Sequence, residues 1–140
     1  MQIIKTIPLF FILLLLYNVV VIGLKSEKGS EGPPPLKKQL HTFTLPSDEQ
    51  WPLTVEDVFI IMGIMVLYIE ILKSTRSGTI TIVEHTLSVF VFIAYLMEFM
   101  MSDLVVYSSF VYLGCMSLVD VLAGFTISIA AARRDFQISG

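Results

Sequence analysis

Cysteine, histidine and charge are all scarce in this sequence. The single cysteine, Cys115, excludes an internal disulfide and any site built from several cysteines. It lies in an apolar run, so we expect a small packed side chain rather than a reactive thiol. The net charge of −3 is too small to indicate a nucleic acid or a highly anionic surface as a partner.

Short catalytic motifs are also missing. The chain contains no G-x-G-x-x-G, Walker loop, G-x-S-x-G or H-E-x-x-H sequence. A di-iron bundle needs Glu-x-x-His pairs and partner glutamates, whereas Glu84 and His85 are adjacent and occur once. We therefore predict that the protein is not an enzyme and holds no metal or cofactor.

The sequence is instead rich in apolar residues, and these are gathered in blocks. Apolar residues make up 55% of the chain and charged ones 15%, against about 45–50% and about 25% in soluble domains. The excess falls into four runs, over residues 3–24, 55–72, 80–101 and 104–132, which is the pattern of membrane-spanning helices. We predict an all-α fold, an integral membrane four-helix bundle.

These runs also predict the domain organisation. Residues 1–24 form the first transmembrane helix. Its apolar stretch is longer than that of a secretory signal and no A-x-A-like site follows it, so we predict an uncleaved signal anchor, with a cleaved signal as the alternative. Residues 25–54 form a Pro/Gly-rich loop outside the cytoplasm, residues 55–132 a three-helix transmembrane core, and residues 133–140 a cytoplasmic tail.

The loop contains the sequence GSEGPPPLKK, which cannot bury a core and predicts an extended or mobile segment. At its end, Trp51 is placed to anchor the chain at the membrane interface. Thr54 and Asp57 have a spacing close to that of a capping box. This spacing indicates that the second membrane helix begins there.

Lysine and arginine near the helix ends predict the orientation, because cytoplasmic loops carry an excess of both. Placing both termini in the cytoplasm puts five of these residues inside, Lys5, Lys73, Arg76, Arg133 and Arg134, and four outside, Lys25, Lys28, Lys37 and Lys38. Arg133 and Arg134 then anchor the last helix at the inner surface. Ser102-Asp103 predicts a very short turn, so the third and fourth helices form an antiparallel hairpin.

Asp120 is the deepest ionisable residue of the predicted membrane helices, near the bilayer midplane. A charge there costs roughly 2.5–3.5 kcal/mol on insertion scales, so such a group normally faces protein or water. It is either a hydrogen-bonded acid that fixes helix packing or a proton or cation site. Mostly small residues recur beside it at spacings of three and four, and let another helix approach closely: Gly114, Ser117, Val121, Gly124, Ser128 and Ala131. Asp120 lies at the edge of this small-residue stripe, aimed at a helix of this chain or of a partner.

A second stripe follows one face of the third helix and is mostly polar: Thr81, Glu84, Ser88, Val91, Tyr95, Glu98 and Ser102. We predict a polar seam inside the bundle, with the lining of a wet path as the alternative. Tyr95 and Glu98 are three residues apart and are placed to hydrogen-bond within the seam. At the cytoplasmic ends of the second and third helices we predict an interfacial salt-bridge cluster of Glu70, Glu84, His85, Lys73 and Arg76.

The later part of the chain contains TVEDVFI, IVEHTLS, YLMEF and VDVLAGFTISIAAARRD, in this order. In this arrangement, over residues 54–136, the chain resembles small uncharacterised bacterial four-helix inner-membrane proteins. The resemblance implies a multi-pass protein of the bacterial inner (plasma) membrane and implies no activity.

The sequence leads us to expect a small accessory, assembly or structural component, acting as a homo-oligomer or in a larger membrane complex. Its partners are then the lipid bilayer and other transmembrane helices. The alternative is a proton or cation pathway that uses Asp120 with Glu98, Glu84 and Glu70. A third hypothesis is an adaptor that uses residues 25–54 as a docking strap outside the cytoplasm.

Overall fold

The computed structural model describes residues 7–27, 35–75 and 79–138, and it is mostly helical. It contains four helices, which confirms that part of the sequence prediction: α2 (Leu9–Glu27), α3 (Val55–Ser74), α4 (Thr79–Met101) and α5 (Ser108–Ile138). A 3-10 helix, η1 (Pro35–Lys37), and two strands, β1 (Gln39–Thr44) and β2 (Gln50–Thr54), lie between α2 and α3. Three of the basic residues used for the orientation, Lys5, Lys28 and Arg76, lie outside the described residues.

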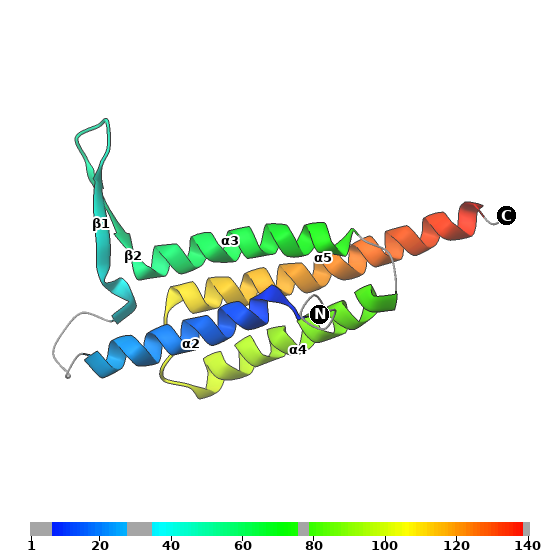
Figure 1. Ribbon diagram of the computed structural model, residues 1–140, viewed down its shortest axis with the longest axis horizontal. Coiled ribbons are helices and arrows are strands. Elements are labelled where there is room, and N and C mark those ends of the chain that lie inside the picture. The colour runs from blue at the N-terminus through cyan, green and yellow to red at the C-terminus, as the bar shows by residue number, and fades with distance from the viewer. Residues whose placement is uncertain (1–6, 28–34, 76–78, 139–140) are drawn as a thin grey trace.

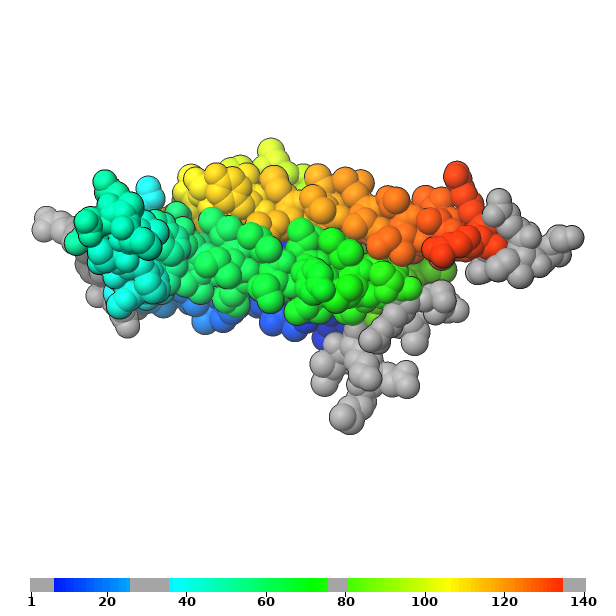
Figure 2. All heavy atoms as spheres, turned by 90° about the horizontal axis from the view of Figure 1, so that it is seen from above, coloured from blue at the N-terminus to red at the C-terminus, as the bar shows by residue number. Residues whose placement is uncertain are grey.

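The four helices lie side by side, and each runs antiparallel to the next along the chain (Figure 1). α5 packs against α3 and α4, and α2 packs against the same two helices. α2 therefore begins, and α5 ends, at one end of the bundle, which we call the termini end. The two strands lie at the opposite end, the hairpin end, and the last turns of α5 project beyond the other helices (Figures 1 and 2).

The start of α3 is a capping box, as the sequence predicts. Thr54 has an extended backbone, with φ −105° and ψ 167°, and its hydroxyl accepts the N–H of Asp57 at 3.3 Å. The Asp57 carboxylate accepts the Thr54 N–H in return, at 2.9 Å. These two bonds satisfy N–H groups that the first turn of a helix would otherwise leave free.

Residues 39–54 form an antiparallel β-hairpin, whereas the sequence analysis places them in an irregular loop. The strands contain β-branched and aromatic residues, which favour extended backbone. The turn between them includes Asp48, whose φ of 62° lies in the left-handed region that aspartate tolerates. The glycines and prolines that suggested a loop are mostly in residues 28–34, outside the described residues.

The connection between α4 and α5 is longer than the predicted two-residue turn. It spans residues 102–107, and α5 begins only at Ser108. Val105 is fully buried in the middle of this connection, so the segment packs into the end of the bundle instead of reversing directly. Cys115 also differs from the prediction: it is exposed on the outer surface of α5 and not packed inside.

Two helices are long and apolar enough to cross a membrane, as judged over the described residues: Thr81–Met101 of α4 and Ser108–Arg134 of α5. The apolar part of α2, Leu9–Lys25, is shorter. α3 carries acids at its start and Glu70 and Lys73 near its end, which lower its apolar character. Length and composition therefore support two of the four predicted spans.

A buried aromatic cluster lies toward the hairpin end of the bundle, and each helix contributes one ring to it. Tyr17 of α2 lies 4.7 Å from Phe59 of α3 and 5.1 Å from Phe110 of α5, measured between ring centroids. Tyr95 of α4 lies 5.2 Å from Phe110. All four side chains are nearly inaccessible to solvent. This aromatic core separates the interior of the termini end from the interior of the hairpin end.

Candidate functional site

A group of ionisable and hydroxyl side chains is buried between three helices on the termini side of the aromatic core. We call it the polar cluster, and it consists of Glu70 and Lys73 of α3, His85 and Ser88 of α4, and Asp120 of α5. Glu70, His85, Ser88 and Asp120 each expose 6% or less of their surface. The sequence analysis placed Glu70 and His85 at an interface and Asp120 elsewhere, whereas here they form one group.

Asp120 faces α4 of its own chain. Asp120 is 3% exposed and lies beside Ser88 of α4, and its Oδ2 has no hydrogen-bond partner among the described residues. Asp120 is twelve residues after Ser108 and thirteen before Arg133, or about 18 Å and about 20 Å along the helix. It therefore lies midway along the apolar part of α5.

His85 packs one turn further along the same helix pair. Its imidazole ring occupies the space that a Cβ atom on Gly124 would need, so α4 and α5 approach closely at this point because position 124 has no side chain. The ring also lies 6.1 Å from that of Phe125. Nε2 of His85 is buried and has no hydrogen-bond partner in the described parts of the chain.

The two stripes found in the sequence face each other across α4 and α5. Tyr95 lies beside Gly114, Ser88 lies beside Asp120, and His85 lies beside Gly124. Residue numbers along α4 therefore rise as those of the neighbouring residues of α5 fall. Such a register is that of two antiparallel helices in continuous contact. Two further members of the small-residue stripe also point inward, since Ser117 is 1% exposed and Ser128 is half-buried.

Glu70 joins the polar cluster to the first helix. Its Oε1 accepts the backbone N–H of Leu9 at 2.6 Å, and Oε2 lies 3.2 Å from the ammonium group of Lys73. Leu9 is the first residue of α2, where N–H groups lack partners inside the helix and the helix dipole favours a negative charge. The carboxylate of α3 therefore caps α2.

Two more buried hydrogen bonds hold α2, one to each remaining helix. The Tyr95 hydroxyl of α4 donates to the Phe10 carbonyl at 3.1 Å, and the hydroxyls of Tyr17 and Ser109 of α5 are 2.8 Å apart. Tyr17 and Ser109 are completely buried. The sequence analysis missed this pair, although a tyrosine inside an otherwise apolar run was a usable signal.

The remaining predicted site residues lie apart from the polar cluster. Glu84 is half-buried next to His85, with which it interacts electrostatically. Glu98 is half-buried on the hairpin side of the aromatic core, ten residues or about 15 Å along α4 from Ser88. Trp51 is exposed on β2 and stacks on Phe43 of β1 at 6.0 Å.

The last residues that the sequence singled out are two predicted interface anchors and one buried threonine. Arg133 and Arg134 are exposed near the end of α5. Thr81 is 9% exposed, near the beginning of α4. Because α4 and α5 are antiparallel, these three residues lie toward the same end of the pair, the termini end (Figure 1).

The hairpin end has a second polar site. Lys37, Glu56, Asp103, Tyr107 and Ser108 line a cavity of about 320 Å³ together with one valine. Burial, and to a smaller extent the nearby Glu56 carboxylate, raise the pKa of the Tyr107 hydroxyl. A phenol with a raised pKa stays neutral, so Tyr107 can donate a hydrogen bond to a carboxylate there.

The chemistry available in the polar cluster is proton and cation chemistry. It contains two carboxylates, one imidazole and one ammonium group in a nearly dry interior. In the described ranges, no three or more His, Cys, Asp or Glu side chains are arranged to hold a metal ion. Comparisons with protein-family models, curated proteins and solved structures find no match for the chain.

Proposed function

We propose that this chain is an integral protein of the bacterial inner (plasma) membrane. In this proposal it acts as an accessory, assembly or structural component of a membrane complex or homo-oligomer, and it catalyses no reaction. Two observations support the proposal. They are the distribution of polarity in the bundle and the exposure of the β-hairpin.

Polarity in the bundle is reversed relative to a water-soluble protein. Large apolar side chains are exposed on the outer face of every helix, for example Val19 (67%), Met65 (57%), Phe90 (64%) and Leu122 (57%). Ionisable groups such as Asp120 are instead buried inside. Water-soluble monomers rarely expose apolar surface on such a scale, whereas lipid favours this arrangement.

The proposed topology has four spans with both termini in the cytoplasm. The orientation rests on the count over the whole sequence, with five lysines and arginines on the side of the termini and four on the side of the hairpin, because cytoplasmic segments carry an excess of both. The hairpin then projects on the opposite side of the membrane. Trp51, four residues before the start of α3 and paired with Phe43, lies on the same side of the membrane in this topology.

The observation that carries the accessory role is the exposure of most of the hairpin. Every residue from 39 to 51 is exposed, and the stacked rings of Phe43 and Trp51 remain 47% and 45% exposed. A two-stranded sheet is marginally stable on its own, and both of its strands have a free edge. A partner that packs on the aromatic pair, or pairs with a strand edge, supplies what the hairpin lacks.

The test places a photoreactive amino acid at Leu45, which is exposed in the turn region, and irradiates native membranes. We expect a discrete crosslinked product whose partner is another membrane protein or a second copy. Phe43→Ser combined with Trp51→Ser should abolish it while leaving the protein level in the membrane unchanged. Glu49→Gln is the matched control and should keep it. A strictly monomeric protein without any crosslink, in membranes and in mild detergent, would overturn the proposal.

A second candidate function is a proton or cation pathway with Asp120 at its centre and Glu70, Glu84 and Glu98 on either side. The observation that favours it is that two of the four buried atoms without a hydrogen-bond partner among the described residues are Asp120 Oδ2 and His85 Nε2. Intramembrane ionisable groups with unsatisfied atoms are typical of proton relays. The aromatic core between Asp120 and Glu98 opposes a continuous pathway.

Flux into liposomes distinguishes the two candidates. A pathway predicts proton or cation flux that Asp120→Asn abolishes without lowering the protein level. The accessory role predicts no flux from either protein. If Asp120→Asn lowers only the protein level, Asp120 serves helix packing.

A further inference from the structure

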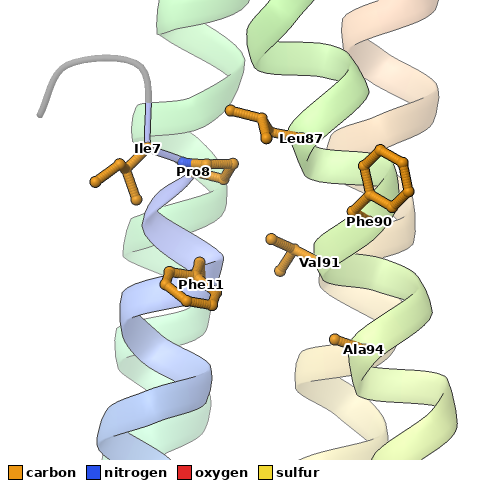
Figure 3. Close-up of a pocket in the computed structure, with 7 residues that line it drawn as sticks. All are labelled: Ile7, Pro8, Phe11, Leu87, Phe90, Val91 and Ala94. Atoms are coloured by element: carbon orange, nitrogen blue, oxygen red, sulfur yellow. The ribbon is translucent and has the colours of Figure 1, made fainter. Parts of the chain in front are cut away.

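An apolar groove opens on the outer surface between the start of α2 and the first half of α4 (Figure 3). Its lining consists of Ile7, Pro8 and Phe11 on one side and Leu87, Phe90, Val91 and Ala94 on the other. The volume of the groove is about 280 Å³. All seven side chains are apolar, so a polar or charged ligand would gain no hydrogen bond from them.

From these features we propose that the groove binds one acyl chain of a membrane lipid. The inference rests on the proposed membrane location of the bundle. On that basis the groove opens into hydrocarbon, because Phe11 and Phe90 on its rims are 40% and 64% exposed on the outer face. On α4 it extends from Leu87 to Ala94, in the middle of the apolar stretch Thr81–Met101, and runs parallel to the helices.

The dimensions of the groove select an acyl chain over a helix. Leu87 and Ala94 are seven residues apart, so the groove follows α4 for about 10 Å, and a helix segment of that length occupies far more than the groove volume of about 280 Å³. A helix with its side chains is about 10–12 Å across and does not fit. A single extended hydrocarbon chain does fit, and its contacts would be apolar throughout.

The polar contact between α2 and α4 lies inside the bundle and not in the groove. Between α2 and α4 the described residues share one hydrogen bond, from Tyr95 to the Phe10 carbonyl, and it lies on the inner side of the seam. The outer side of the seam has no such bond in the described structure. An acyl chain in the groove would fill the gap between Phe11 and Val91 that Figure 3 shows.

The experiment uses vesicles of phosphatidylcholine that contain a small fraction of phosphatidylcholine with a diazirine in one acyl chain. The full-length protein is reconstituted, excess unlabelled lipid is added as a chase, and the sample is irradiated. Crosslinked residues are then identified by mass spectrometry. We expect severalfold more label at Phe11 and Val91 than at Ile129, an exposed residue of α5 outside the groove, because the bound lipid exchanges slowly.

Two matched variants test whether the acyl chain occupies the groove. Ala94 points into the groove, so Ala94→Phe fills it and should reduce the groove label severalfold without changing the label at Ile129 (Figure 3). Ile93→Phe adds the same ring at the next position, on the lipid-facing surface, and should leave the groove label unchanged. Leu87→Trp fills the groove from its rim and serves if Ala94→Phe fails to fold, as judged by circular dichroism.

Three results would overturn the proposal. Equal label in the groove and at Ile129 would show ordinary solvation by lipid, and label that persists when the groove is filled would place the lipid elsewhere. Label at Ile129 with none at Phe11 and Val91 would show that the groove excludes lipid, as a second protomer seated there would make it. Failure of the proposed membrane location gives a different outcome, since label would then be missing at Ile129 as well and alkaline washing would release the protein.

Discussion

The close approach of α4 and α5 at Gly124 predicts a large effect from a very small substitution. Gly124→Ala adds one methyl group in the space that the His85 ring occupies. The matched control is Gly23→Ala in α2, since a Cβ atom there meets nothing within 4 Å. Both positions are inside helices, so alanine favours the helix equally in both by up to about 1 kcal/mol.

The magnitude follows from packing. Overfilling a packed interior costs about 1–3 kcal/mol, so Gly124→Ala should lower the free energy of unfolding despite its better helix propensity. Gly23→Ala should raise it by up to about 1 kcal/mol. Removing the ring with His85→Ala in the Gly124→Ala background should restore part of the loss, with a coupling energy of about 1–3 kcal/mol between the two sites.

Unfolding in mixed micelles with increasing sodium dodecyl sulfate, followed by circular dichroism, measures these differences. The five proteins are the unaltered chain, the two glycine variants, His85→Ala, and the double variant that combines Gly124→Ala with His85→Ala. If Gly124→Ala were as stable as Gly23→Ala, the ring would not lie against position 124. If the free energy of unfolding lost in the double variant equalled the sum of the losses in the two single variants, the two residues would not be in contact.

Two further substitutions test the ties of the helices. Tyr17→Phe leaves the buried hydroxyl of Ser109 without its partner, so it should lower the free energy of unfolding by about 0.5–1.5 kcal/mol in the same assay. Tyr68 is exposed, and the control Tyr68→Phe should cause no measurable change. Thr54→Ala removes the capping box and should cost about 1 kcal/mol, with faster hydrogen exchange at the Asp57 amide; an unchanged exchange rate there would contradict the capping role.

The sequence predicts the helices well because their signals are local. Long apolar runs and the Thr54–Asp57 capping pair need only the residues that carry them. The spacing of small residues around Asp120 and of polar residues along α4 also predicts which faces turn inward, since helical periodicity is a property of each segment alone. The sequence therefore predicts the two stripes but not their contact with each other.

Tertiary partners were harder to predict. Glu70 binds the backbone N–H of Leu9 and Tyr95 binds the backbone carbonyl of Phe10, and backbone groups are the same at every position in the sequence. The pairing of Tyr17 with Ser109 joins residues 92 positions apart. The hairpin was not predicted, because the prolines and glycines that precede it indicated a loop over all of residues 25–54.

The central claim is that the bundle lies in a bilayer with the hairpin outside and the end of α5 inside. Cys115, the one cysteine in the sequence, is exposed in the structure, so only lipid can protect it. A maleimide that cannot enter membranes should leave Cys115 unlabelled until detergent denatures the protein. In a Cys115→Ala background it should label Asp48→Cys in intact spheroplasts, and Arg134→Cys only after the membrane is opened. Rapid labelling of Cys115 in intact membranes, or labelling of both added cysteines from the same side, would contradict the account.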